Sequence, residues 1–142
     1  VGYPRSEKVL RQWLAANSAG VGRERAARLL ARYGTRASEV IAAIRADEGD
    51  RPIRDAAAYS TAELRHLAAT EHVVHLDDLL RRRTNLVFTG DAGRDCVRDV
   101  AETIAEVCGW DADDIEREEA AVLAMLERQG RYRVEERATS RV

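Results

Sequence analysis

The chain has 142 residues, of which 45% are hydrophobic and 34% charged, and its net charge at pH 7 is −2. This composition is too apolar for a disordered chain and too charged for a membrane-spanning one. The length allows one domain, or at most two very small ones, and excludes a dinucleotide-binding sheet joined to a separate substrate domain. With two Pro and one Phe, the composition favours helices.

Three amphipathic helices are expected in the first 46 residues. Ser6 can cap the first helix, which should run to about Ala16, and a glycine-containing break follows it. The second helix should cover 23–33, and Thr35 can cap the third. The apolar residues at helical spacing are Val9, Leu10, Trp13, Leu14, Ala26, Leu29, Leu30, Val40, Ile41 and Ile44.

A polar stretch over 47–58 follows and contains Gly49 and Pro52, so we expect a loop there. It is the one plausible boundary between a small N-terminal unit and the rest of the chain. Ser60 and Glu63 then have the spacing of a capping box, in which a hydroxyl and a carboxylate each accept from a free backbone amide. The fourth helix should therefore begin here and reach about Val74.

Three further helices are expected, over 77–86, 94–108 and about 111–129, with a turn-rich stretch after the first of them. Residues 131–142 show no periodicity and should fray. No run alternates as a strand does. The predicted fold is all-α, a single domain of about six to seven helices packed as an orthogonal-type bundle over residues 1–130.

Charge is unevenly distributed along the chain. Residues 1–36 contain eight basic and two acidic side chains, whereas 99–119 contain nine acidic and one basic. The two segments could attract each other within the fold or meet different partners. Cys96 and Cys108 would be about 18 Å apart on one helix, too far for a disulfide, so a reducing cytosolic compartment is the default. The chain lacks a signal peptide and begins with Val1, so we interpret it as a piece of a longer protein.

Enzyme motifs are absent from the sequence, which has no Walker A, GxSxG, HExxH or CxxC pattern. The glycine-containing turn near Gly20 and Gly22, between two short helices at 5–47, resembles a helix-hairpin-helix motif. In that motif backbone amides and nearby arginines bind a phosphate. A nucleic-acid-binding module is therefore the alternative function, although the slightly acidic chain disfavours it. A turn that merely joins two helices is the simpler interpretation.

Three histidines, His66, His72 and His75, are the only basis for a metal site. Two of them lie one turn apart with carboxylates near. Histidines on a helix surface are much commoner than ligands with this spacing, so we predict no metal.

Two charges interrupt apolar stripes and form the most informative pattern in the chain. Glu71 continues the stripe of the fourth helix, and Arg83 lies at the centre of that of the fifth. A buried charge needs a partner, because leaving it alone costs several kcal/mol. We therefore predict an ion pair between Glu71 and Arg83, with Arg82 as the nearest substitute. Either the pair fixes how the two helices cross, or an arginine of 81–83 points outward and docks another domain.

The same residues resemble a pattern found in the C-terminal domain of FAD-dependent glycerol-3-phosphate dehydrogenases. There an acidic helix start is followed by a Glu and then by an Asp-x-Leu-x-Arg-Arg-Thr segment. The positions that match are Glu63, Glu71, Asp78, Leu80, Arg82, Arg83 and Thr84. Weaker similarity extends over about residues 20–120, and it includes Cys108 where the family usually has Leu.

The resemblance implies that the parent protein oxidises sn-glycerol 3-phosphate to dihydroxyacetone phosphate. FAD would take the hydride and pass the electrons to quinone at the cytoplasmic membrane. The flavin fingerprint and substrate residues of the family belong to an N-terminal part, so no catalytic or cofactor-binding residue falls in this chain. The chain would be an accessory cap, with Glu71, Asp78, Arg82, Arg83 and Thr84 as ion-pair or docking candidates, and could contribute to a homodimer or to membrane-side contacts.

Overall fold

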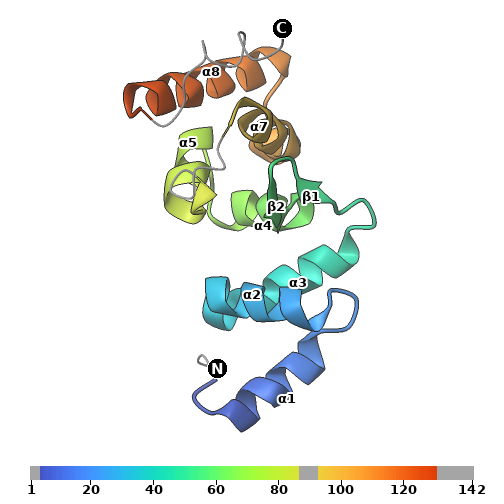
Figure 1. The fold of residues 1–142 in the computed structure, drawn as a ribbon. Coiled ribbons are helices and arrows are strands. Elements are labelled where there is room, and N and C mark those ends of the chain that lie inside the picture. The colour runs from blue at the N-terminus through green and yellow to red at the C-terminus, as the bar shows by residue number, and fades with distance from the viewer. Residues whose placement is uncertain (1–3, 87–92, 131–142) are drawn as a thin grey trace, which may run out of the picture. The chain divides into compact units, whose positions relative to one another are not determined.

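The computed structural model describes residues 4–86 and 93–130, which separate into two compact units, Val1–Asp50 and Arg51–Val142 (Figure 1). The fold class is all-α, as predicted, with one small two-stranded sheet. The α-helices are α1 (Glu7–Asn17), α2 (Arg23–Tyr33), α3 (Ala37–Ala46), α4 (Thr61–Thr70), α5 (Leu76–Asp78), α7 (Arg94–Cys108) and α8 (Ala112–Arg128). The expected turn-rich stretch at 89–93 and the frayed tail at 131–142 fall wholly or mostly outside the described residues.

The N-terminal unit packs α1, α2 and α3 around a small aliphatic core. Its buried side chains are Leu14, Ala26, Leu29, Leu30, Ala37, Val40, Ile41 and Ile44. Ser6 caps α1 as predicted, since its hydroxyl accepts from the amide of Val9 at 3.2 Å. The predicted Thr35 cap is wrong: 34–36 form a 3-10 turn that leads directly into α3, so the chain enters α3 already helical.

The C-terminal unit begins with an element that the sequence did not predict. Strands β1 (Pro52–Ile53) and β2 (Ala56–Ser60) pair antiparallel, with an irregular register between Pro52 and Ile53. The hairpin turn contains Asp55 at φ 57°, a conformation that Asp tolerates better than most residues. The strands are too short to alternate visibly, and the hairpin buries only Ile53, Ala56 and Tyr59 among its apolar side chains.

Helices α4, α7 and α8 provide most of the core of this unit, with α7 packed on both of the others. The buried face of α7 includes Val97, Val100, Ala101 and Ile104 at helical spacing, whereas Val107, expected on the same face, is 41% exposed. Asp111 caps α8 in a reciprocal capping box with Asp114. No helix in the described ranges is long and apolar enough to cross a membrane.

Helix α4 ends four residues earlier than predicted. His72 adopts φ 50°, and the amide of Val73 donates to the carbonyl of Ala68 at 3.2 Å. This is the pattern that closes helices through a left-handed residue, usually glycine. Ser60 still caps the start of α4, since its hydroxyl accepts from the amide of Glu63.

The predicted helix over 77–86 is also only partly α-helical. After the single turn of α5 the chain continues as a π-helix over Leu79–Arg83, and Thr84 is extended. Leu76, Leu79 and Leu80 are all fully buried. The wider turn keeps this leucine cluster in the core, and π-turns of this kind are frequent at functional sites.

A carboxylate on α7 ties the hairpin to the helices. Asp99 is 2% exposed, and its two carboxylate oxygens accept hydrogen bonds from Nη2 and Nη1 of Arg51 at 2.6 and 2.8 Å. It also accepts from the backbone amide of Arg54 at 2.9 Å. The Arg51 guanidinium, opposed by burial, holds the pKa of Asp99 below its ordinary value. The start of the unit is therefore fixed to α7 by charge-assisted hydrogen bonds.

Replacing Asp99 tests this anchor. We expect Asp99→Asn to lower the free energy of unfolding by about 1–3 kcal/mol, because donors that the carboxylate satisfied lose their acceptor. Urea unfolding measures the change. Glu24→Gln, which removes the partner of Arg28 in a pair on the surface of α2, should change it by less than about 0.5 kcal/mol. Equal effects of the two variants would contradict the anchor.

The same pair predicts an acid dependence. The depressed pKa means that the stabilisation by Asp99 is present above about pH 3.9, the ordinary value, and is lost as pH falls through the lower pKa of the folded state. The stability difference between the native chain and Asp99→Asn should therefore shrink in that window, measured as urea midpoints at stepwise lower pH. A difference that stayed constant with pH would exclude a charged Asp99 as its source.

Candidate functional site

The predicted pair of charges between the fourth and fifth helices is present. Arg83 Nη1 lies 3.1 Å from Glu71 Oε2. The pair is not buried, however: the side chains of Arg83 and Glu71 are 46% and 19% exposed. The expectation that both charges face the core is wrong because α4 ends at Thr70 and the π-turn rotates Arg83 outward, so that the pair spans the surface of the corner between the two segments.

The other candidate residues lie along the same π-turn. Arg82 Nε is 3.6 Å from Asp78 Oδ1, one turn earlier, and the arginine is 77% exposed. Thr84 is buried, and its hydroxyl donates to the carbonyl of Leu80 at 3.1 Å and accepts from the amide of Leu86. Thr84 thus ends the helical segment, whereas the charged residues face solvent. We call Glu71, Asp78, Arg81, Arg82 and Arg83 the charged corner.

A tyrosine from the hairpin holds the far end of this segment. The Tyr59 hydroxyl donates to Asn85 Oδ1 at 2.6 Å and accepts from the Asn85 amide at 3.1 Å. Tyr59 is 3% exposed. The charged corner is therefore supported by buried leucines below it and by a side-chain hydrogen bond at its end, so its backbone is well held while its arginines stay accessible.

The start of the segment is held from α8. Glu118 accepts from the backbone amide of Leu76 at 2.9 Å and contacts His75 Nδ1 at 3.0 Å. It supplies the cap that no side chain of α5 provides. The Glu118 carboxylate, which accepts a hydrogen bond from the protonated imidazole, raises the pKa of the exposed His75 above its ordinary value. Glu118 was not among the site residues predicted from the sequence.

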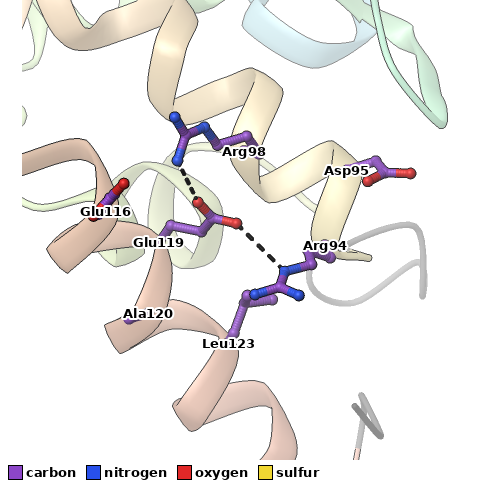
Figure 2. A pocket seen from close by; sticks show the side chains of 7 residues that line it. All are labelled: Arg94, Asp95, Arg98, Glu116, Glu119, Ala120 and Leu123. Atoms are coloured by element: carbon purple, nitrogen blue, oxygen red, sulfur yellow. Dashed lines mark hydrogen bonds and ion pairs between the residues drawn. The ribbon is translucent and has the colours of Figure 1, made fainter. Parts of the chain in front are cut away.

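A hollow of about 500 Å³ between α7 and α8 is a second feature that was not predicted from the sequence (Figure 2). Glu119 lies at its centre, with Arg98 Nη1 at 2.9 Å and Arg94 Nε at 3.7 Å. Glu119 interrupts the apolar stripe of α8 one turn before Val122 and Leu123, so the rule that found Glu71 could have found it. Both arginines of α7 contact this one carboxylate of α8, so the charged groups in the hollow link the two helices.

The histidines and cysteines of the described ranges do not gather into a metal-binding cluster. No group of three or more His, Cys, Asp or Glu residues there could hold a metal ion. His75 is held by Glu118, and His66 has a buried Nε2 without a hydrogen-bond partner among those residues. Cys108 lies against the carbonyl of Val73, and burial raises the pKa of its thiol, which disfavours a reactive thiolate.

The turn between α1 and α2 has the glycines of the predicted hairpin, but two of its amides already donate within the turn. Gly20 and Gly22 have φ of 80° and 86°. The amides of Val21 and Gly22 donate to the carbonyl of Ser18, and Arg45 donates to the carbonyls of Ala19 and Asn17. These two amides already donate to a carbonyl within the turn, so they are not available to bind a phosphate. The geometry of the turn therefore gives no support to the nucleic-acid alternative.

A double-mutant cycle tests the ion pair of the charged corner. Glu71→Ala, Arg83→Ala and the double variant should give a coupling of about 0.2–1 kcal/mol, because the half-exposed arginine is screened by water. Chemical unfolding of the four proteins supplies the values. A coupling of several kcal/mol would mean that the pair behaves as a buried one.

His75 should titrate above its ordinary value of about 6.5. Its contribution to stability is present below that pH and is lost as pH rises through the raised pKa of the folded state. NMR titration of the imidazole checks this, with Glu118→Gln expected to lower the pKa. Glu116→Gln, on the same helix, is the matched control, and an unchanged pKa in Glu118→Gln would contradict the assigned cause.

Comparison with known proteins relates the chain to alpha-glycerophosphate oxidase and to glycerol-3-phosphate dehydrogenases. Residues 4–115 match the family model for the C-terminal domain of alpha-glycerophosphate oxidase. Glycerol-3-phosphate dehydrogenase 2 of Mycobacterium tuberculosis H37Rv and that of Mycobacterium bovis are each 42% identical over 101 residues, and glycerol-3-phosphate dehydrogenase of Mycobacterium leprae is 39% identical. Each match covers 70% of this chain and 17% of the relative. No solved structure matches.

The match extends over both units and includes every residue of the charged corner. The chain spans about a sixth of the length of these relatives, so it corresponds to one portion of them. The chain belongs to the family of C-terminal domains of alpha-glycerophosphate oxidase and related glycerol-3-phosphate dehydrogenases.

Proposed function

We propose that this chain is the helical accessory domain of a flavin-dependent glycerol-3-phosphate dehydrogenase and is not catalytic alone. The full-length protein would oxidise sn-glycerol 3-phosphate to dihydroxyacetone phosphate. The observation that carries the proposal is the family match over residues 4–115, together with the small share of each relative that the chain covers.

The flavin would be FAD, held by the part of the protein that precedes this domain. The described residues do not fit FAD: their only sheet is a two-stranded antiparallel hairpin, without the parallel strands and glycine-rich turn of a dinucleotide site. In the hollow between α7 and α8 the Glu119 carboxylate is engaged by Arg98 and Arg94. Binding, hydride transfer and substrate recognition are thus assigned elsewhere in the protein.

The role of this domain would be to pack on that flavin-binding part through the charged corner. Arg82 is 77% exposed and lies 3.6 Å from Asp78, and Arg83 is half exposed. Their backbone is fixed by the buried leucines and by Tyr59, so little conformational entropy would be lost on docking. Acidic groups on the facing surface would complete the interface.

The resemblance also suggests the setting of the full-length protein. It would lie on the cytoplasmic face of the membrane, pass electrons to quinone and could form a homodimer. These proposals concern the whole protein, and the present domain contributes to them through its attachment to the flavin-binding part.

Reconstitution in two pieces tests the proposal. The preceding part of the longer protein, expressed without this domain, should retain less flavin and unfold at lower temperature than when this chain is added to it. Flavin absorbance after desalting and the melting temperature provide the readouts, and dye reduction by glycerol 3-phosphate reports activity. This chain alone should bind no flavin and reduce no dye.

The charged corner is tested in the same assay by Arg82→Ala/Arg83→Ala. This variant should weaken the effect of the added chain, whereas Arg117→Ala, which breaks an exposed pair on α8, should not. Flavin binding by this chain alone would overturn the accessory role. A chain that changed neither flavin content nor melting temperature would overturn the docking role.

A further inference from the structure

Two exposed valines lie at one place in the C-terminal unit. Val74, in the loop that follows α4, is 64% exposed, and Val107, in the last turn of α7, is 41% exposed. Exposed valines scattered over a protein surface are normal and need no explanation. These two valines differ from scattered ones because a tertiary contact joins the residues next to them.

The contact is made by the thiol of Cys108. Its Sγ donates to the carbonyl oxygen of Val73 at 3.6 Å, and Val107 and Val74 are the sequence neighbours of these two residues. Covalent geometry therefore limits the distance between the Cα atoms of the two valines to about 13 Å. A stable interface covers about 800 Å² on each partner, so one partner can bury both valines.

Val74 is presented by a loop whose backbone is held before and after it. The amide of Val73 donates to the carbonyl of Ala68 at 3.2 Å. Two residues after Val74, the amide of Leu76 donates to Glu118 on α8 at 2.9 Å. A backbone that is already fixed loses little conformational entropy when a partner binds to it.

A tryptophan extends this surface beyond the end of α7. Gly109 ends the helix at φ 70°, and the amide of Trp110 donates to the carbonyl of Ala105 at 2.8 Å. This backbone pattern fixes the position of Trp110, whose side chain is half-buried. Tryptophan is enriched among the residues that dominate the binding energy of interfaces. We call Val74, Val107 and Trp110 the apolar patch.

The apolar patch adjoins the charged corner. Val74 follows Glu71 by three residues, so their Cα atoms are at most about 11 Å apart. Glu71 is the residue that contacts Arg83 at 3.1 Å. Protein interfaces have a centre depleted in charged side chains and a polar rim. The patch and the corner together have this composition.

We propose that the apolar patch is the centre of the surface by which this domain packs on the preceding part of the longer protein, with the charged corner at its edge. The inference rests on the proposed function, which supplies the partner. The segment shared with each relative is 17% of that relative, so these proteins contain ample further chain to cover the patch. All three residues of the patch lie within the family match over 4–115.

Photo-crosslinking tests what covers the patch. A benzophenone amino acid at position 74 or 107 of the longer protein should crosslink to residues of the preceding part, identified by mass spectrometry of the linked peptides. The same amino acid at position 121 is the control. Ala121 is exposed on α8 and lies outside the family match, so no crosslink to the preceding part is expected there.

A charged variant tests whether the patch stabilises the packing. In the longer protein, Val74→Asp/Val107→Asp should lower the melting temperature by several degrees and reduce the flavin retained after desalting, because two carboxylates would be buried without partners. In the 142-residue chain alone both sites face water, so the same variant should hardly change the melting temperature. Ala121→Asp/Ala124→Asp adds the same charge to exposed positions of α8 and should leave flavin retention unchanged.

Three results would overturn the inference: crosslinks only to a second copy of this domain, no crosslink to any peptide, or a charged variant that destabilises the chain alone as much as the longer protein. Isotope-labelled and unlabelled chains, mixed before irradiation, identify a second copy. A longer protein that retains no flavin would overturn the proposed function instead. Crosslinks from positions 74 and 107 to its preceding part would still support the patch as the packing surface.

Discussion

The carboxylate of Asp99 is the interaction on which the C-terminal unit depends. It is almost fully buried, and a buried carboxylate is tolerated only when donors replace its lost water. Arg51 and the amide of Arg54 do so, which fixes the hairpin to α7. The hairpin carries Tyr59, and Tyr59 holds Asn85 at the end of the π-turn. The position of the charged corner therefore depends, through the hairpin, on the Asp99 carboxylate of α7.

The same physical pattern recurs at three places, and only one of them was predicted from the sequence. Glu71, Asp99 and Glu119 each interrupt an apolar stripe at helical spacing, and each has an arginine partner. Glu71 stood out because Arg83 interrupts a neighbouring stripe. The partners of Asp99 and Glu119 come from 48 and 21 residues away, and helical periodicity carries no information about which arginine crosses to which carboxylate. The acidic residues could be found from sequence; their partners required the fold.

The limits of the helices could be predicted from periodicity wherever the apolar stripe was long and the ends had ordinary caps. The limits of α2 and α7 agree with the sequence, and α8 begins after its Asp111 cap. The departures share a different cause. His72 ends α4 in a left-handed conformation that glycine usually supplies, and the π-turn keeps Leu76, Leu79 and Leu80 buried at a spacing that an α-helix also fits. Tertiary packing determines the left-handed conformation of His72 and the π-turn, so neither could be predicted from the residue types alone.

The acidic segment illustrates how far a charge pattern can be interpreted before a fold is known. Nine acidic residues in 99–119 suggested attraction to the basic N-terminus or to a partner. Yet Asp99, Asp114, Glu118 and Glu119 each pair with a basic side chain of their own unit. A carboxylate whose oxygens already accept charged donors offers little to an outside cation, because a new contact must first break an existing one. Arg82 and Arg83 are paired at or near the surface, so they retain more capacity to meet acidic groups. Docking is therefore proposed at this corner rather than at the segment with the larger charge.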